Sequence, residues 1–374
     1  MTQKRILLLK EKEDKRYGDN SGVKSMSSQI NETQEFQFDA DYFQQRLPQQ
    51  YKSVLNEFQK IAKQFFLFHT IFISTLLIEC IALFPLGAAF SRSTFLALGL
   101  GVLFLTLFSY LILLFYQQAK KPEQIRLLLH RFIESCKSAI GLPEKMAQHH
   151  LNIADALLKL AAYLDVNEER SFFFPKFLYP FIARSTSFCY LKDVFYFKQL
   201  LMHAAIDEHL EQIRATPTDL EVHASLASAY VLLSQLYKAP KEADETPFHA
   251  MYHKNITLFE EQFERASKLA IEEFEILNQY APNDPWIHEQ LAMGYRNLGL
   301  YQKEIAEIEL LLKLKAHDRE LLFRLGSLYF EQNQNARGLE IYEQLKQSNF
   351  KRAEELISGY GKASILKMIQ ESGI

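Results

Sequence analysis

Two long apolar runs separated by a short polar break constrain this chain more than any other feature. The second run, Phe95 to Tyr116, has 22 residues and no charge. At about 1.5 Å per residue it is long enough for a hydrocarbon core of roughly 30 Å. The first run, Phe65 to Leu86, carries one carboxylate, Glu79. Its Leu, Ile and Phe residues contribute about −0.3 to −0.6 kcal/mol each near a bilayer centre, which outweighs about +2.5 to +3.5 kcal/mol for that carboxylate.

The pair therefore predicts a transmembrane helical hairpin, with two helices buried in a large soluble fold as the open alternative. Cations flank the pair on both sides, whereas the break between the runs has one cation, Arg92. The flanking cations are Arg46, Lys52, Lys60, Lys63, Lys120, Lys121, Arg126, Arg131 and Lys137. Because cytoplasmic flanks are rich in Lys and Arg, this pattern predicts both termini on the cytoplasmic side and a lipid bilayer around residues 65–116.

Glu79 is the one acid inside the runs. An antiparallel pair that turns near Phe90 puts it level with Gly99 and Gly101, where two helix backbones can approach closely. We interpret it as a protonated or hydrogen-bonded group that helps the two helices associate, and not as part of a transport path.

The rest of the chain divides by composition. Residues 1–45 are polar and predict a disordered arm, and 46–64 have helical apolar spacing and predict an amphipathic helix leading into the first span. After the hairpin, 65–116, comes an amphipathic segment, 117–142, which either lies on the membrane surface or packs as the first helix of the next domain. Residues 143–374 form that next domain.

Composition and motifs exclude several functions. The formal net charge is −3 and Lys/Arg-rich runs with interleaved aromatics are absent, so we expect no nucleic-acid partner. Cys80, Cys136 and Cys189 lack metal or disulfide spacing, and His249 and His253 lack nearby acids on the same helix face. Phosphate-binding glycine loops and nucleophile motifs are also absent. We therefore predict no catalytic residue, no metal, no cofactor and no enzyme activity.

An internal repeat with a period of 34 residues makes the C-terminal part readable. Leu291, Ala292, Tyr295 and Gly299 recur 34 positions later. Their counterparts are Leu325, Gly326, Tyr329 and Asn333. Each unit predicts two helices: the first buries Leu, a small residue and Tyr, and the second follows a turn at the Gly or Asn.

This pattern resembles the tetratricopeptide repeat (TPR) family over about 145–352. Gly338 and Tyr342 fit the small and aromatic positions of the second helix, while Glu304 and Ile308 depart from them. The residues that fit in earlier units are Leu226, Ala227, Tyr230, Ala270, Phe274, Leu277 and Pro282, then Leu160, Ala161, Leu164, Ala205 and Pro217. The fold class is thus all-α: a two-helix transmembrane hairpin followed by a TPR-like α-solenoid.

The resemblance implies that the concave face of the solenoid binds a protein or peptide. By the family's register the lining residues are Trp286, Glu289, Met293, Arg296, Asn297, Phe323, Ser327 and Phe330. The family subtype that clamps carboxylate tails with Lys, Asn and Arg is not matched, because only Arg324 fits that set.

We therefore predict a membrane-anchored scaffold or adaptor that binds a protein or peptide on the cytoplasmic face. Cutting the chain near 143 is expected to leave a soluble helical fragment. One alternative comes from hydropathy alone: the paired spans resemble those of chlamydial inclusion membrane proteins, which would place the chain in a vacuole membrane facing the host cytosol. Another is a membrane-bound enzyme that uses the repeat insertions at 171–187 and 238–258 as active-site loops.

Overall fold

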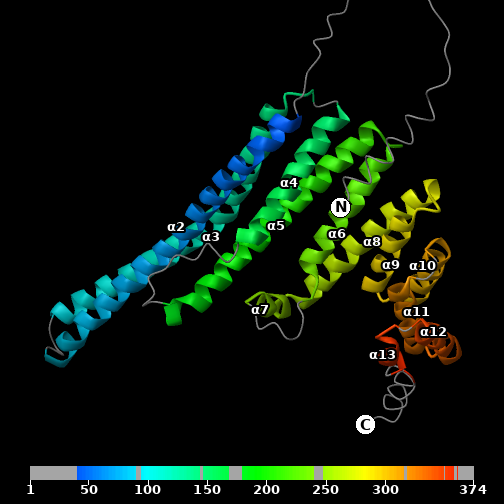
Figure 1. Ribbon diagram of the computed structural model, residues 1–374. Helices are drawn as coiled ribbons and strands as arrows, with labels where there is room; N and C mark the ends of the chain where they lie inside the picture. The colour runs from blue at the N-terminus through cyan, green and yellow to red at the C-terminus, as the bar shows by residue number, and fades with distance from the viewer. Residues whose placement is uncertain are drawn as a thin grey trace, which may run out of the picture.

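The computed structural model describes residues 40–89, 94–143, 146–167, 179–239, 247–315, 318–348, 350–357 and 360. Every regular element in these residues is a helix, and helix pairs stack one after another from the N-terminal hairpin to the C-terminus (Figure 1). Most of the predicted polar arm lies outside the described residues, but its last six residues already belong to the first described helix.

The first two described helices are long and unbroken. Helix α2 spans Ala40–Ala89 and α3 spans Thr94–Ile140, and they lie side by side (Figure 1). The predicted lead-in helix therefore runs directly into the first apolar run, as expected. The segment 117–142 is not a separate helix, because it continues α3 as far as Ile140.

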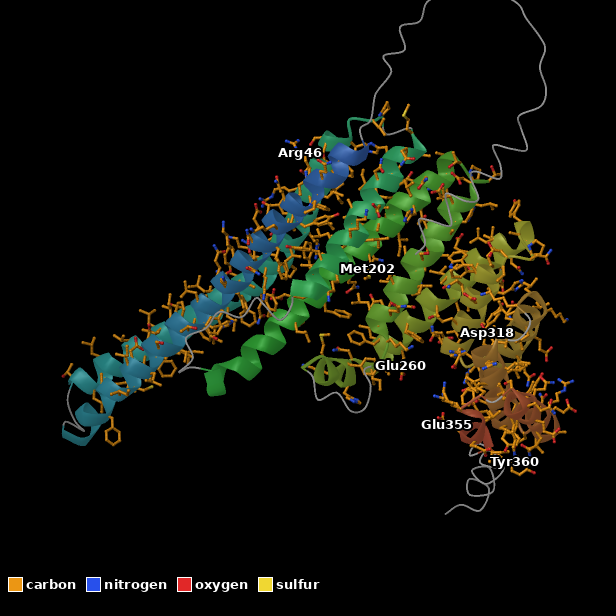
Figure 2. The ribbon with its side chains drawn as sticks, in the orientation of Figure 1. Arg46, Met202, Glu260, Asp318, Glu355 and Tyr360 are labelled. Carbon is orange, nitrogen blue, oxygen red and sulfur yellow. The ribbon has the colours of Figure 1, made fainter. Side chains whose placement is uncertain are left out.

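The apolar halves of α2 and α3 project from the molecule as a hairpin. No residue of the most apolar window in either helix is buried, and the mean hydropathies of these windows are 2.1 and 2.4. Phe84 is 83% exposed and Phe104 is 72% exposed. Figure 2 shows side chains along both helices of this hairpin, and no other helix lies beside its far end. Both helices are thus long and apolar enough to cross a membrane.

The other halves of α2 and α3 belong to the core of the body. Phe58 stacks on Phe197 with ring centroids 5.2 Å apart, and Tyr51 lies 5.9 Å from Tyr163. The buried residues of α3 include Ile125, Leu128, Phe132 and Cys136. The segment 117–142 therefore packs into the body, and the repeats up to α9 share one core with these helix ends. The last repeats, from α9 onward, also form a second buried cluster of their own.

The repeats follow as helix pairs, each pair consisting of a first and a second helix that pack together. The pairs are α4 (Ala147–Asn167) with α5 (Tyr179–Ala215), α6 (Leu220–Tyr237) with α8 (Ile256–Tyr280), α9 (Pro285–Asn297) with α10 (Tyr301–Leu314), and α11 (Arg319–Glu331) with α12 (Asn335–Gln347). Helix α7 (Pro247–Lys254) lies between α6 and α8, and α13 (Ala353–Ile357) packs on the last pair.

Aspartates begin three of the first helices. Asp219 accepts a hydrogen bond from the Glu221 N–H at 3.0 Å, and Asp284 accepts one from the Trp286 N–H at 2.9 Å. Asp318 accepts two, from the N–H groups of residues 320 and 321. Each carboxylate satisfies N–H groups that the first helical turn leaves open, which fixes where the helix starts.

The predicted turns at Gly299 and Asn333 are confirmed. Both residues have positive φ, at 66° and 58°. The next residue in each case donates its N–H to the carbonyl of a buried tyrosine, Tyr295 at 2.9 Å and Tyr329 at 2.7 Å. This pattern of a left-handed residue and a 6→1 hydrogen bond ends both first helices in the same way.

A histidine at the fourth position of three first helices joins each one to its partner helix. His150, His223 and His288 place Nδ1 2.6 Å from a carboxylate oxygen of the second helix. The carboxylates belong to Glu208, Glu273 and Glu307. His223 and His288 also donate from Nε2 to the carbonyls of Pro217 and Pro282, at 3.0 and 2.8 Å. We call these three contacts the histidine clamps; the last pair has Leu322 in this place.

The clamps also set the register of the first repeat. Equating His150 with His223 aligns Ile153, Ala154 and Leu157 with Leu226, Ala227 and Tyr230. The sequence-based register, which used Leu160, Ala161 and Leu164, is one heptad too late. Both sets are buried, so hydrophobicity alone does not distinguish them.

Candidate functional site

The open part of the predicted binding surface lies on α9. We call its four residues, Glu289, Met293, Arg296 and Asn297, the α9 face. Met293 is 46% exposed, and Arg296 is exposed as well. Glu289 pairs with Lys315, and Asn297 accepts a hydrogen bond from Lys238 at 3.3 Å. The α9 face thus combines the exposed thioether of Met293 with polar side chains, two of which are bonded to lysines outside α9.

Trp286 lies at the start of the same helix but packs on its own chain. Its ring meets Phe274 edge-on, with centroids 5.6 Å apart, and it is half-buried. Trp286 thus anchors α9 on α8, and replacing it would disturb the packing of the repeat as well as any binding surface on α9.

The predicted lining residues of α11 are covered by the end of the described chain. The Phe323 ring lies 4.3 Å from the Arg352 guanidinium and 6.1 Å from the Phe350 ring centroid. Arg352 also pairs with Glu320 at 3.0 Å. The Ser327 hydroxyl donates within its own helix, to the Phe323 carbonyl at 3.0 Å. Phe323 therefore mainly holds the C-terminal segment in place, whereas Ser327 is bonded within α11.

Phe330 is not a surface residue. It is 1% exposed, and a Cβ added at Gly338 would lie only 2.5 to 2.8 Å from its ring. The Tyr360 ring meets it edge-on, with centroids 5.7 Å apart. The prediction that Phe330 contacts a partner is therefore wrong, because the glycine on α12 makes room for the ring inside the last pair.

A buried carboxylate joins the last two pairs. Glu304, in the first turn of α10, is 0% exposed. It accepts hydrogen bonds from Arg296 Nε at 2.7 Å, and from two nitrogens of Arg324 at 2.9 and 3.0 Å. We call this cluster the Glu304 clamp. It explains why a glutamate replaces the small residue that the repeat pattern expects, and it ties Arg296 of the α9 face to the interior.

A lysine on α3 shows where the apolar hairpin leaves the body of the protein. Lys121 pairs with Asp193 of α5, and its ammonium lies 4.1 Å from the centroid of the Phe65 ring. Phe65 is the first residue of the apolar runs, so Lys121 marks where the hairpin leaves the body. Burial raises the pKa of Asp193, although the nearby Lys121 opposes this shift.

Inside the hairpin two polar contacts join the helices. Glu79 accepts a hydrogen bond from the Thr106 hydroxyl at 2.7 Å, and His69 lies 2.9 Å from the Tyr110 hydroxyl. Gly99 does mark a close approach, but a Cβ there would meet Leu83 at 2.5 Å. The prediction placed Glu79 level with Gly99 and Gly101, but in the structure Glu79 lies opposite Thr106, and Leu83 is the residue that faces Gly99.

The second insertion is described only in part, at residues 238–239 and 247–258. His253 is exposed on α7, and the described residues contain no group of three His, Cys, Asp or Glu side chains that could hold a metal ion. The side chain of His249 and the first insertion up to residue 178 lie outside what is described.

Comparison with known proteins adds a fold-level likeness. No protein-family model matches the chain, and no curated protein matches it. Among solved structures, similarity was found to YrrB, a TPR protein with an unusual peptide-binding site, at 14% identity and a TM-score of 0.31, covering 59% of this chain and 96% of that one. The TPR2AB domain of yeast Sti1 in complex with pHSP90 is 16% identical, with a TM-score of 0.23 and coverages of 67% and 94%. A human IFIT1 dimer with PPP-AAAA is 14% identical, with a TM-score of 0.29 and coverages of 91% and 88%.

These scores are low, so the assignment of TPR-like repeats rests on the helix pairs, caps and turns described above. None of the three proteins just described supports the likeness to chlamydial inclusion membrane proteins.

Proposed function

We propose that the protein is a membrane-anchored, TPR-like scaffold whose repeats bind a protein or peptide. In this proposal the α2/α3 hairpin crosses the bilayer, and both of its ends, with the repeats, lie on the cytoplasmic side. The repeats are the binding part, as they are in TPR proteins generally.

The observation that carries the anchor is the contrast along α2 and α3. In one half of each helix, large apolar side chains are exposed on the sides that do not face the other helix, while in the other half they are buried in the body. Soluble monomers rarely expose apolar patches larger than a few hundred Å². Full burial of a Leu, Ile or Phe side chain is worth roughly 1.5–3 kcal/mol, and in water each of these partly exposed side chains forgoes a share of that figure. A bilayer removes this cost along the whole hairpin.

The polar groups of the hairpin suit an anchor. Glu79 and His69 each have a partner on the opposite helix, so neither has to enter the bilayer alone. These contacts hold the two helices together and leave their outer surface apolar.

The anchor is tested by membrane extraction of the full chain. We expect the protein to stay with the membrane fraction at alkaline pH. A variant with Phe104→Lys and Ile78→Lys should be released or degraded, because each Lys costs about 2.5–3.5 kcal/mol at the bilayer centre. The matched control places lysine at Leu127, which is exposed on α3 beyond Lys121. Release of the unmodified chain at alkaline pH would refute the anchor.

The α9 face is the best candidate for the site that binds the partner. Met293 offers an adaptable apolar contact, and the ion pair and amide beside it supply polar contacts. A photo-crosslinking residue at 293 should capture one defined partner that a matched residue at Leu310, exposed on α10, does not capture. Identical crosslinking at both positions would contradict a binding role for this face.

Alanine substitution of Trp286 or Phe323 is a poorer test. Both rings pack on their own chain, so a lost partner would not separate binding from folding.

A further inference from the structure

Helix α5 continues beyond the level at which the hairpin leaves the body. Asp193 pairs with Lys121 at that level. Three residues later, Tyr196 accepts a hydrogen bond from Arg126, which lies farther from the hairpin tip on α3. Residue numbers along α5 therefore decrease toward the tip of the hairpin. Figure 1 shows the first turns of α5 extending in the same direction as α2 and α3.

The extension is about four turns long. Between Asp193 and the first residue of α5, Tyr179, the helix rises ~21 Å along its axis at about 1.5 Å per residue. This length is too short to cross a hydrocarbon core of roughly 30 Å, but it is enough to enter one leaflet.

The sequence of this extension is that of a membrane-interface segment. Residues 179–189 read YPFIARSTSFC, with three aromatic residues and a single charge, Arg184. Aromatic residues favour the level of the lipid headgroups, and an arginine can extend its guanidinium to that level from a deeper backbone position. Pro180 also removes one of the N–H groups that the start of a helix leaves open.

We propose that residues 179–189 of α5 insert into the leaflet nearest the body and contact lipid beside the hairpin. The inference rests on the proposed membrane anchor, because the hairpin sets the level of the bilayer. A bilayer is the partner that the geometry favours, because the exposed apolar hairpin starts at Phe65 and α5 passes that level in the same direction. The body would then touch the membrane at a third helix, which crosses only one leaflet.

A cysteine scan tests this directly. Spin labels are placed one at a time at residues 180–186 of the full chain, with the native cysteines replaced, in nanodiscs of phosphatidylcholine and phosphatidylglycerol. Seven consecutive positions cover every side of the helix, so the test does not depend on which side chain faces lipid. Relaxation by dissolved oxygen is compared with relaxation by a water-soluble nickel chelate.

Two further labels provide the references. A label at Leu107, exposed in the hairpin, reports lipid, and one at His203, exposed in the second half of α5, reports water. We expect at least two positions in the scan to match Leu107, with oxygen access several-fold above chelate access. Seven labels that match His203, or that neither reagent reaches, would overturn the insertion of α5 while a lipid signal at Leu107 keeps the anchor. A water signal at Leu107 would overturn both.

Discussion

Removing the charge of Glu304 should loosen the last two repeats specifically. In Glu304→Gln the side chain keeps its shape but cannot balance two guanidinium groups. Glu304 is fully buried and accepts three charge-assisted hydrogen bonds at 2.7 to 3.0 Å. Hydrogen bonds to charged groups contribute about 1.5–3 kcal/mol each, and breaking a buried ion pair typically costs about 3–5 kcal/mol.

The arginines reduce that figure. The side chain of Arg296 is 46% exposed and that of Arg324 is 26% exposed, so both can turn partly to water once released. We therefore expect a loss of about 2–4 kcal/mol in local stability. At about 1.4 kcal/mol per tenfold, this corresponds to a drop in amide protection of roughly 30-fold to several hundred-fold.

Hydrogen exchange followed by mass spectrometry measures this by segment. Protection should fall in α9, α10 and α11 and stay unchanged in α4 and α5, which the Glu304 clamp does not touch. Glu340→Gln, on the exposed surface of α12, is the control and should change stability by less than about 0.5 kcal/mol. Equal small effects of both substitutions, or a loss spread evenly over all helices, would refute the role given to the clamp.

Three further predictions concern the repeats and the body. Burial alone would lower the pKa values of His223 and His288, but hydrogen bonds to a carboxylate and to a proline carbonyl outweigh burial and raise both pKa values. The thermal unfolding midpoint should therefore fall as pH rises from about 6.5 through those raised values. An H223N/H288N variant should show a flatter dependence of this midpoint on pH. Gly338→Ala should cost about 1–3 kcal/mol in urea unfolding despite better helix propensity, because its methyl group meets Phe330, and adding Phe330→Leu should recover part of the loss; additive losses would contradict this contact. Because the first repeats share a core with α2 and α3, a fragment starting at 143 should aggregate in size-exclusion chromatography, contrary to the soluble fragment expected from the sequence. A chain in which a short Gly/Ser loop replaces the hairpin should remain soluble, and a monodisperse fragment would show that the repeats do not need α2 and α3.

The sequence predicted the elements whose signals are local. The apolar runs, the 34-residue period and the turns at Gly299 and Asn333 each depend on residues close together in the chain, and the structure contains the corresponding helices and turns. The membrane location of the hairpin and the binding face remain proposals.

What the sequence reasoning missed depends on distant partners. Glu304 departs from the small residue of the repeat pattern, and only its contact with Arg324 in the structure explains why. Phe330 was assigned to the surface because no nearby residue in the sequence shows that Gly338 faces its ring. The histidine clamps did leave a signal. Pro217, Asp219 and His223 have the same spacing as Pro282, Asp284 and His288, so aligning these two stretches would have found the histidines of two of the three clamps.

The unbroken course of α2 and α3 has a mechanical consequence. Two rods that continue from the tip into the body leave no swivel between them, so any change in the tilt of the hairpin turns the repeats through the same angle. Pro122 lies inside α3, next to Lys121, and removes one backbone hydrogen bond at this height. The ion pair between Lys121 and Asp193 braces α3 beside this missing bond, so the hairpin and the body still turn together. A change in bilayer thickness that tilts the hairpin would swing the far repeats through a long arc.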